Sequence, residues 1–215
     1  MSVLVRMMIP VDELSTIFSD LEPVPQDDGP DPVCVIQYPT SFRLAYDYMR
    51  AVWQANELSE RALRLTALCL KLNPANYTVW QYRRKILRSL GRSADKDAIA
   101  ADLALSSSLG GTNPKNYQVW YHRRALLDEY PSLQQDFLDS ELDYISTVLE
   151  EDSKNYHAWS NRQWLIAAVN QKDLWEKELQ YGRFSHFLSL FKYQGWNLFS
   201  LFLLMILLFL FFFLF

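Results

Sequence analysis

The sequence has few cysteines and no alternating apolar pattern, and these two features argue against a disulfide-rich domain and a β-rich domain, respectively. Its 215 residues include two cysteines, Cys34 and Cys69, which are too few for a disulfide framework. No secretory signal peptide opens the sequence, so we expect reduced thiols and a cytoplasmic location. No run of strand length alternates apolar and polar residues, which argues against a β-rich domain.

Several chemical motifs are also missing. The chain has no nucleotide-binding loop, no cluster of metal-ligand residues and no nucleophile beside a base. The net charge of −4 is modest and the basic residues are spread along the chain, which argues against nucleic-acid binding. We therefore expect that this chain binds no metal or cofactor and does not catalyse a reaction alone.

What the sequence does contain is one motif that occurs three times. It reads NPANYTVWQYRR from residue 73, NPKNYQVWYHRR from residue 113 and DSKNYHAWSNRQ from residue 152. Trp80, Trp120 and Trp159 mark the copies at separations of 40 and 39 residues. A period in this range indicates an array of repeats in which each unit buries a face against the next.

Each motif starts with a signal for a helix. The residues predicted to be helix N-caps are Asn73, Asn113 and Asp152, and a proline follows in the first two copies. A second amphipathic stretch precedes each motif, and one more helix fits residues 41–54. We therefore predict an all-α fold, a right-handed stack of antiparallel helical hairpins, over residues 40–181.

The two ends of the chain differ from this repeat domain. Residues 1–39 have no Lys or Arg after Arg6 and several prolines, which predicts an acidic, extended leader. Residues 182–215 form a hydrophobic tail, in which residues 196–215 are an apolar run long enough to cross a membrane. Of the last 17 residues, 14 are Phe or Leu, so a membrane anchor and translated non-coding sequence both stay open.

Side chains that recur in all copies are interpreted as structural, because a function at one site would not require them three times. Aromatic residues at helical spacing are usually core, and arginines are suited to ion pairs and carbonyl contacts. The residues in this group are Trp80, Trp120, Trp159, Arg83, Arg123 and Arg162.

Lys115 does not follow the repeat. The equivalent residue is Ala75 in the first copy and Lys154 in the third, so the repeat does not demand a cation at this position. From the residues alone, a solvated lysine is the ordinary interpretation. A histidine such as His157 on an amphipathic helix is likewise most often a packing or surface residue.

The Asn-Tyr-x-x-Trp-x-x-Arg-Arg pattern resembles the repeat of protein prenyltransferase α subunits. Ordered segments from DDGPDPVCVIQY to LWEKELQY, roughly residues 24–181, resemble the α subunit shared by protein farnesyltransferase and type I geranylgeranyltransferase. After Tyr181 the register fails, so the chain looks like an α subunit truncated after about three repeats. The NYQ beside Lys115 fits this group better than the α subunit of Rab geranylgeranyltransferase.

The resemblance implies a heterodimer that attaches a farnesyl or geranylgeranyl group to the Cys of a C-terminal CaaX motif. The expected partners are a β subunit, an isoprenoid diphosphate and CaaX proteins. Zinc would be held by the β subunit, and magnesium is implied for the complex. The choice of prenyl group would depend on the β subunit rather than on this chain.

The resemblance also implies roles for individual residues. Lys115 would be the catalytic cation near the diphosphate. The substrate-binding residues implied in the same way are Tyr117, Gln118, Asn155, Tyr156, His157 and, as a weaker counterpart, Tyr77. Two other functions stay open, a noncatalytic helical-repeat scaffold and a tail-anchored or aberrant splice product without activity.

Overall fold

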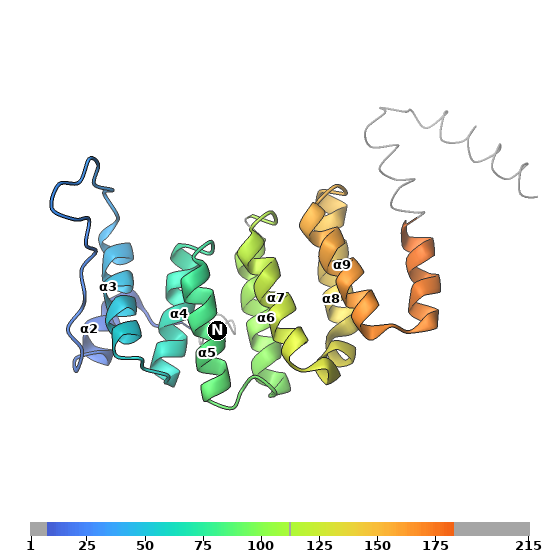
Figure 1. Cartoon of the computed structure of the whole chain (residues 1–215), viewed down its shortest axis with the longest axis horizontal. Coiled ribbons are helices and arrows are strands. Elements are labelled where there is room, and N and C mark those ends of the chain that lie inside the picture. The colour runs from blue at the N-terminus through green and yellow to red at the C-terminus, as the bar shows by residue number, and fades with distance from the viewer. Residues whose placement is uncertain (1–7, 112, 183–215) are drawn as a thin grey trace, which may run out of the picture.

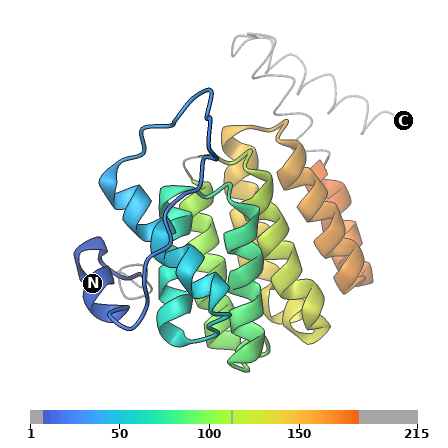
Figure 2. The same cartoon turned by 60° about the vertical axis from the view of Figure 1, so that its left-hand side comes forward.

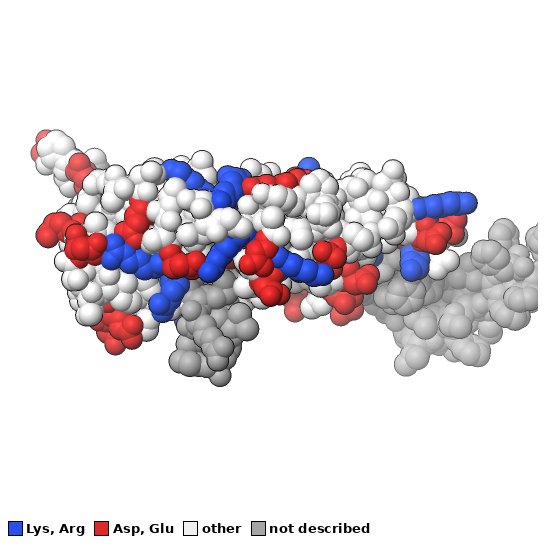
Figure 3. Space-filling model, turned by 90° about the horizontal axis from the view of Figure 1, so that it is seen from below, with Lys and Arg blue, Asp and Glu red and all other residues white. Residues whose placement is uncertain are grey.

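The fold is a row of helices that stand side by side (Figure 1). Seen from below, acidic and basic side chains lie interspersed along this row (Figure 3). The computed structural model describes residues 8–111 and 113–182. Every regular element in these residues is a helix, which confirms the predicted all-α stack of antiparallel hairpins. Within the same residues, no helix has the length and hydrophobicity needed to cross a membrane. The predicted hydrophobic tail lies outside the described residues, apart from its first position.

Pairs of consecutive helices build the stack. α3 (Thr40–Gln54) packs against α4 (Glu60–Leu72), and a helical segment over residues 172–182 lies at the other end. Between them, the three repeats pair α4 with α5 (Tyr77–Ser89), α6 (Lys96–Gly110) with α7 (Tyr117–Glu129), and α8 (Pro131–Glu151) with α9 (Tyr156–Val169). The motif thus supplies the second helix of each hairpin.

The N-caps of the motif helices lie three residues later than predicted, so that prediction was wrong. The N-caps are Asn76, Asn116 and Asn155, whose side-chain oxygens accept the amide protons of Val79, Gln118 and Ala158. The predicted caps, Asn73, Asn113 and Asp152, each accept the amide proton two residues later, within a turn before the helix. Asn and Asp are favoured at the first position of a β-turn, and proline, present in the first two copies, is favoured at the second. The turn occupies these residues, so the helix starts after it.

The extended leader predicted for residues 1–39 is wrong for its first described part. Val11–Glu13 form a 3₁₀ turn (η1) and Leu14–Ile17 a helical turn (α2), at the first end of the stack (Figure 2). Leu14 and Phe18 are fully buried, and the ring of Phe18 stacks on Tyr48 of α3 at 5.6 Å. This segment covers the apolar face of α3 and α4, as the end of a repeat array requires. Residues 22–39 contain no helix or strand, as predicted.

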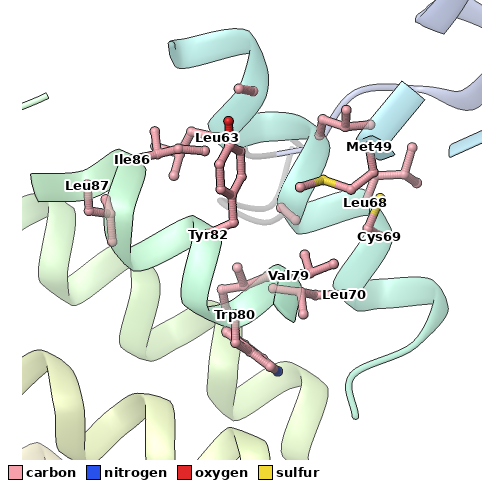
Figure 4. Packing of buried hydrophobic residues seen from close by; sticks show 14 of the residues in the cluster. Met49, Leu63, Leu68, Cys69, Leu70, Val79, Trp80, Tyr82, Ile86 and Leu87 are labelled. Carbon is pink, nitrogen blue, oxygen red and sulfur yellow. The ribbon is translucent and has the colours of Figure 1, made fainter. Parts of the chain in front are cut away.

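The motif tryptophans hold the turns before their helices by hydrogen bonds. Trp80 is fully buried and lies on α5 next to Val79 (Figure 4). Each indole N–H donates to the backbone carbonyl six residues earlier, at N···O distances of 2.8 Å for Trp80, 2.7 Å for Trp120 and 2.9 Å for Trp159. One side chain therefore fills the hairpin core and fixes the turn that precedes its own helix.

A buried arginine of each motif joins three helices. Arg83 of α5 donates through Nη1 to the Leu63 carbonyl of α4 at 2.8 Å, and through Nε to the Asp102 carboxylate of α6, also at 2.8 Å. Arg123 of α7 repeats this arrangement with the Leu103 carbonyl and the Glu141 carboxylate. The arginine therefore ties its own hairpin to the first helix of the next hairpin.

The same bridge is present beyond the third repeat. Arg162 of α9 donates to Glu178 of the segment 172–182, and its guanidinium lies 3.7 Å from the ring centre of Tyr181. Arg123 lies 3.9 Å from the ring centre of Tyr144 in the equivalent position. The repeat register therefore continues to Tyr181, the last residue of the predicted repeat domain.

His122 of α7 is the buried centre of the interface between the first two repeats. It is fully buried, its ring lies 4.3 Å from that of Trp80, and its Nε2 lies 3.3 Å from the Asp102 carboxylate. Burial lowers the pKa of His122 to about 4, and the nearby negative charge of Asp102 only partly opposes this shift. Burial would raise the pKa of Asp102, but the charge of Arg83 and the contact with His122 lower it to about 2.

The buried bridge predicts a large loss of stability for Arg123→Met. The substitution leaves the Glu141 carboxylate buried without its cation, which typically costs about 3–5 kcal/mol of unfolding free energy. Arg124→Met is the matched control, because Arg124 and its partner Asp128 are both exposed and such pairs contribute about 1 kcal/mol or less. Urea denaturation compares the two, and Arg123→Met/Glu141→Leu should recover much of the loss. Equal stability of the two single variants would contradict the bridge.

His122 predicts a dependence of stability on pH. Its folded pKa of about 4 lies below the ordinary value of 6.5, so the unfolded state takes up the proton first as the pH falls. Stability should therefore be complete above pH 6.5 and decline toward pH 4. We expect His122→Gln to flatten this part of the melting-temperature profile, whereas His157→Gln, which keeps His122, retains it. Parallel profiles for wild type and His122→Gln would show that His122 does not cause the decline.

Candidate functional site

The starts of the motif helices lie along one edge of the stack, at the top of Figure 1. Each helix begins with a tyrosine, and these tyrosines are exposed, although the tryptophan and the first arginine of each motif are buried or half-buried. The exposed fractions are 68% for Tyr77, 62% for Tyr117 and 73% for Tyr156. Because large exposed aromatics often mark contact surfaces, this row, here named the tyrosine edge, is the candidate site.

Lys115 lies in the turn before α7, two residues ahead of Tyr117, and therefore at the tyrosine edge. Its side chain is 69% exposed, and its Nζ lies 3.1 Å from Oδ2 of Asp152 in the next turn. The turn, rather than the first turn of the helix, carries the cation. Lys115 thus presents a positive charge at the surface, in the turn that directly precedes the helix of Tyr117.

The structure brings Tyr117, Tyr156 and His157 together. The ring of Tyr117 meets the ring of His157 edge-on at 5.4 Å, and Tyr156 meets the same imidazole edge-on at 5.7 Å. They border a shallow cleft of about 120 Å³ between α7 and α9. Its lining residues are Tyr117, Trp120, Tyr121, Arg124, Tyr156, His157, Ser160 and Asn161.

The other residues implied by the resemblance are placed differently. Asn155 is buried, and its amide both caps α9 and donates to the Pro114 carbonyl at 3.0 Å, so it links the second and third turns. Gln118 is half-buried on the first turn of α7. Tyr77 stands one repeat away and does not line the cleft. The substrate-binding roles of all three stay predictions.

Three residues near the cleft have no site role predicted from the sequence: Arg84, Tyr121 and Arg124. Tyr121 lines the cleft and is 48% exposed, and the guanidinium of Arg84 lies 5.0 Å from the centre of its ring. Burial lowers the pKa of Arg84. Arg124 also lines the cleft. One feature of the sequence could have identified the two arginines. Arg84 and Arg124 are the second arginines of the first two motifs, and the third motif has Gln163 at this position, so the repeat does not require an arginine there.

The site therefore combines cations with aromatic surface. Lys115 and Arg124 supply exposed positive charge, while the tyrosines supply flat apolar faces with a polar end. Such an arrangement suits a partner that carries an anionic group next to an apolar one. Among residues 8–111 and 113–182, no three side chains of His, Cys, Asp or Glu come together in a way that could hold a metal ion.

Comparison with known proteins gives consistent matches. The model of the protein prenyltransferase alpha subunit repeat matches residues 59–90, 99–130 and 138–169, one match for each hairpin. A relative from Schizosaccharomyces pombe, named protein farnesyltransferase/geranylgeranyltransferase type-1 subunit alpha, is 35% identical over 152 residues, which are 71% of this chain and 37% of that protein. A relative of the same name from Solanum lycopersicum is 54% identical over 74 residues, which are 34% of this chain and 21% of that protein.

A solved structure agrees with these matches. Candida albicans protein geranylgeranyltransferase-I complexed with GGPP superposes with a TM-score of 0.69 and 30% identity, over 80% of this chain and 56% of that one. The chain thus spans well under two thirds of the length of the relatives and of the solved chain that it matches.

Proposed function

Because this chain belongs to the protein prenyltransferase alpha subunit repeat family, we propose that it is the α subunit of a heterodimeric CaaX prenyltransferase. The enzyme would transfer a farnesyl or geranylgeranyl group to a C-terminal cysteine of a protein in the cytoplasm. The observation that carries the proposal is that all three repeats match the family model and place Lys115 and the exposed tyrosines along one edge of the stack.

The tyrosine edge is proposed to face the β subunit and the substrates. In this arrangement, Lys115 stabilises the negative charge that develops on the departing diphosphate. Tyr117, Tyr156 and His157 form the wall beside it, and Gln118 and Tyr77 contact the peptide or the partner. Asn155 contributes by fixing the turn that carries Lys115, since its amide holds the Pro114 carbonyl.

This chain would work only as part of the heterodimer. The β subunit is proposed to hold the zinc ion, which activates the thiol of the substrate, and magnesium would accompany the diphosphate in the complex. The contribution of this chain's residues is a rigid edge, and the arginine bridges give that edge its rigidity. A preorganised cation at such an edge stabilises charge without rearranging during the reaction.

The proposal predicts a complex and a loss of activity for Lys115→Ala. Two versions should be co-expressed with a type I β subunit: the chain itself, and the chain continued after residue 182 by the remaining repeats of a longer relative. We expect the β subunit to copurify and a CaaX peptide to be prenylated. In single-turnover assays, Lys115→Ala should lower the rate about 100-fold, because one charge-stabilising donor is removed.

Lys154→Ala is the matched control, since Lys154 follows the same turn position in the third repeat. It should keep the wild-type rate, and both variants should melt close to the wild-type temperature. Folded chains of both versions that never bind a β subunit would contradict the proposal and favour a noncatalytic scaffold. A complex in which Lys115→Ala turns over normally would remove the catalytic role of Lys115 alone.

A further inference from the structure

The residue that opens the turn before each motif helix differs between the repeats in one side-chain atom, an amide nitrogen in Asn73 and Asn113 and a carboxylate oxygen in Asp152. In each turn, the first residue accepts the backbone amide proton two residues later, at 3.1 Å for Asn73, 3.2 Å for Asn113 and 3.1 Å for Asp152. This bond uses one side-chain oxygen, which the amide of asparagine supplies as well as a carboxylate does. The turn therefore does not require the negative charge of Asp152.

The second oxygen of Asp152 contacts Lys115. The distance from Oδ2 to Nζ is 3.1 Å, and the two side chains are 28% and 69% exposed. A pair this exposed typically adds little to folding stability. At the preceding boundary between repeats, the two equivalent residues are Ala75 and Asn113, which are uncharged. The ion pair is thus a local addition to the second boundary, and stability does not explain it.

A side-chain hydrogen bond also joins the two turns that carry this pair. Nδ2 of Asn155 donates to the Pro114 carbonyl at 3.0 Å, directly before Lys115. Within the third turn, the Asp152 carbonyl accepts the backbone amide proton of Asn155 at 3.0 Å. The carboxylate is therefore held at a fixed place relative to the base of the lysine side chain. A long, flexible lysine then has one preferred direction at the tyrosine edge.

We propose that Asp152 is a positioning residue that holds the ammonium group of Lys115 toward the diphosphate of the isoprenoid substrate. This inference rests on the proposed function. An ammonium group has three N–H donors, so one can remain on Asp152 while the other two face the oxygens of the anion. Without Asp152, the ammonium group would sample several rotamers, and part of the reacting population would lack its cation.

Two measurements on Asp152→Asn test the proposal, because asparagine keeps the turn and removes only the charge. The first is the rate at which an N-hydroxysuccinimide ester acetylates each lysine of the folded chain, followed by mass spectrometry. Losing the ion pair should speed acetylation of Lys115 roughly twofold to fivefold. Lys172 and Lys177, in the segment 172–182, are internal references and should not change. An unchanged rate at Lys115 would overturn the proposal.

The second measurement is single-turnover prenylation in the complex with the β subunit. Asp152→Asn should be slower by about tenfold, since a displaced catalytic group commonly costs one to two orders of magnitude. Affinity for the CaaX peptide and the melting temperature should stay at wild-type values. In a Lys115→Ala background, adding Asp152→Asn should have no further effect. A further loss in that background would show that Asp152 acts independently of Lys115, and the positioning role would be wrong.

The outcomes separate this inference from the proposed function. A slow Lys115→Ala variant together with a fast Asp152→Asn variant overturns the inference and keeps the function. A normal rate for Lys115→Ala overturns both roles in catalysis, while the acetylation rate still reports whether the ion pair exists.

Discussion

The buried bridge from each motif arginine to the next hairpin is the interaction on which the rest of the structure depends. Arg83, Arg123 and Arg162 each reach an acidic residue on the helix or helical segment that follows their own hairpin, and all three are almost fully buried. Hydrophobic packing brings helices together but leaves their rotation and offset adjustable. A guanidinium that is hydrogen-bonded to several fixed partners allows only one rotation and one offset. The bridges therefore set the register of one hairpin against the next.

The candidate site is a consequence of that register. Its residues come from different repeats, so the contact between Tyr117 and His157 and the pair between Lys115 and Asp152 exist only if α7 and α9 keep a fixed offset. Within each repeat, the tryptophan N–H fixes the turn that precedes its own helix. Buried residues that recur in every repeat therefore hold the helical stack together. Exposed residues that differ between repeats determine the chemistry of the tyrosine edge.

The sequence predicted the helical stack better than the helix starts and the contacts between repeats. The period of the tryptophans was sufficient for an all-α stack, and the recurrence of the arginines was sufficient to class them as structural. The exact helix starts were missed, because Asn73 and Asn76 are both good caps and only the turn decides which one is used. The folded segment around Leu14 and Phe18 was missed because its helical turn is short and its burial depends on the exposed end of the stack. The pair between Lys115 and Asp152 joins residues 37 positions apart, which spacing alone does not reveal.

We propose that the tyrosine edge is the face that meets the partner subunit. Hydrogen–deuterium exchange of this chain, alone and in complex with a type I β subunit, distinguishes this face from the others. Backbone amides of residues 113–121 and 152–161 should become protected in the complex, while amides in the middle of α4 and α6 exchange as before. Protection confined to α4 and α6, with unchanged exchange at the tyrosine edge, would place the partner on another face.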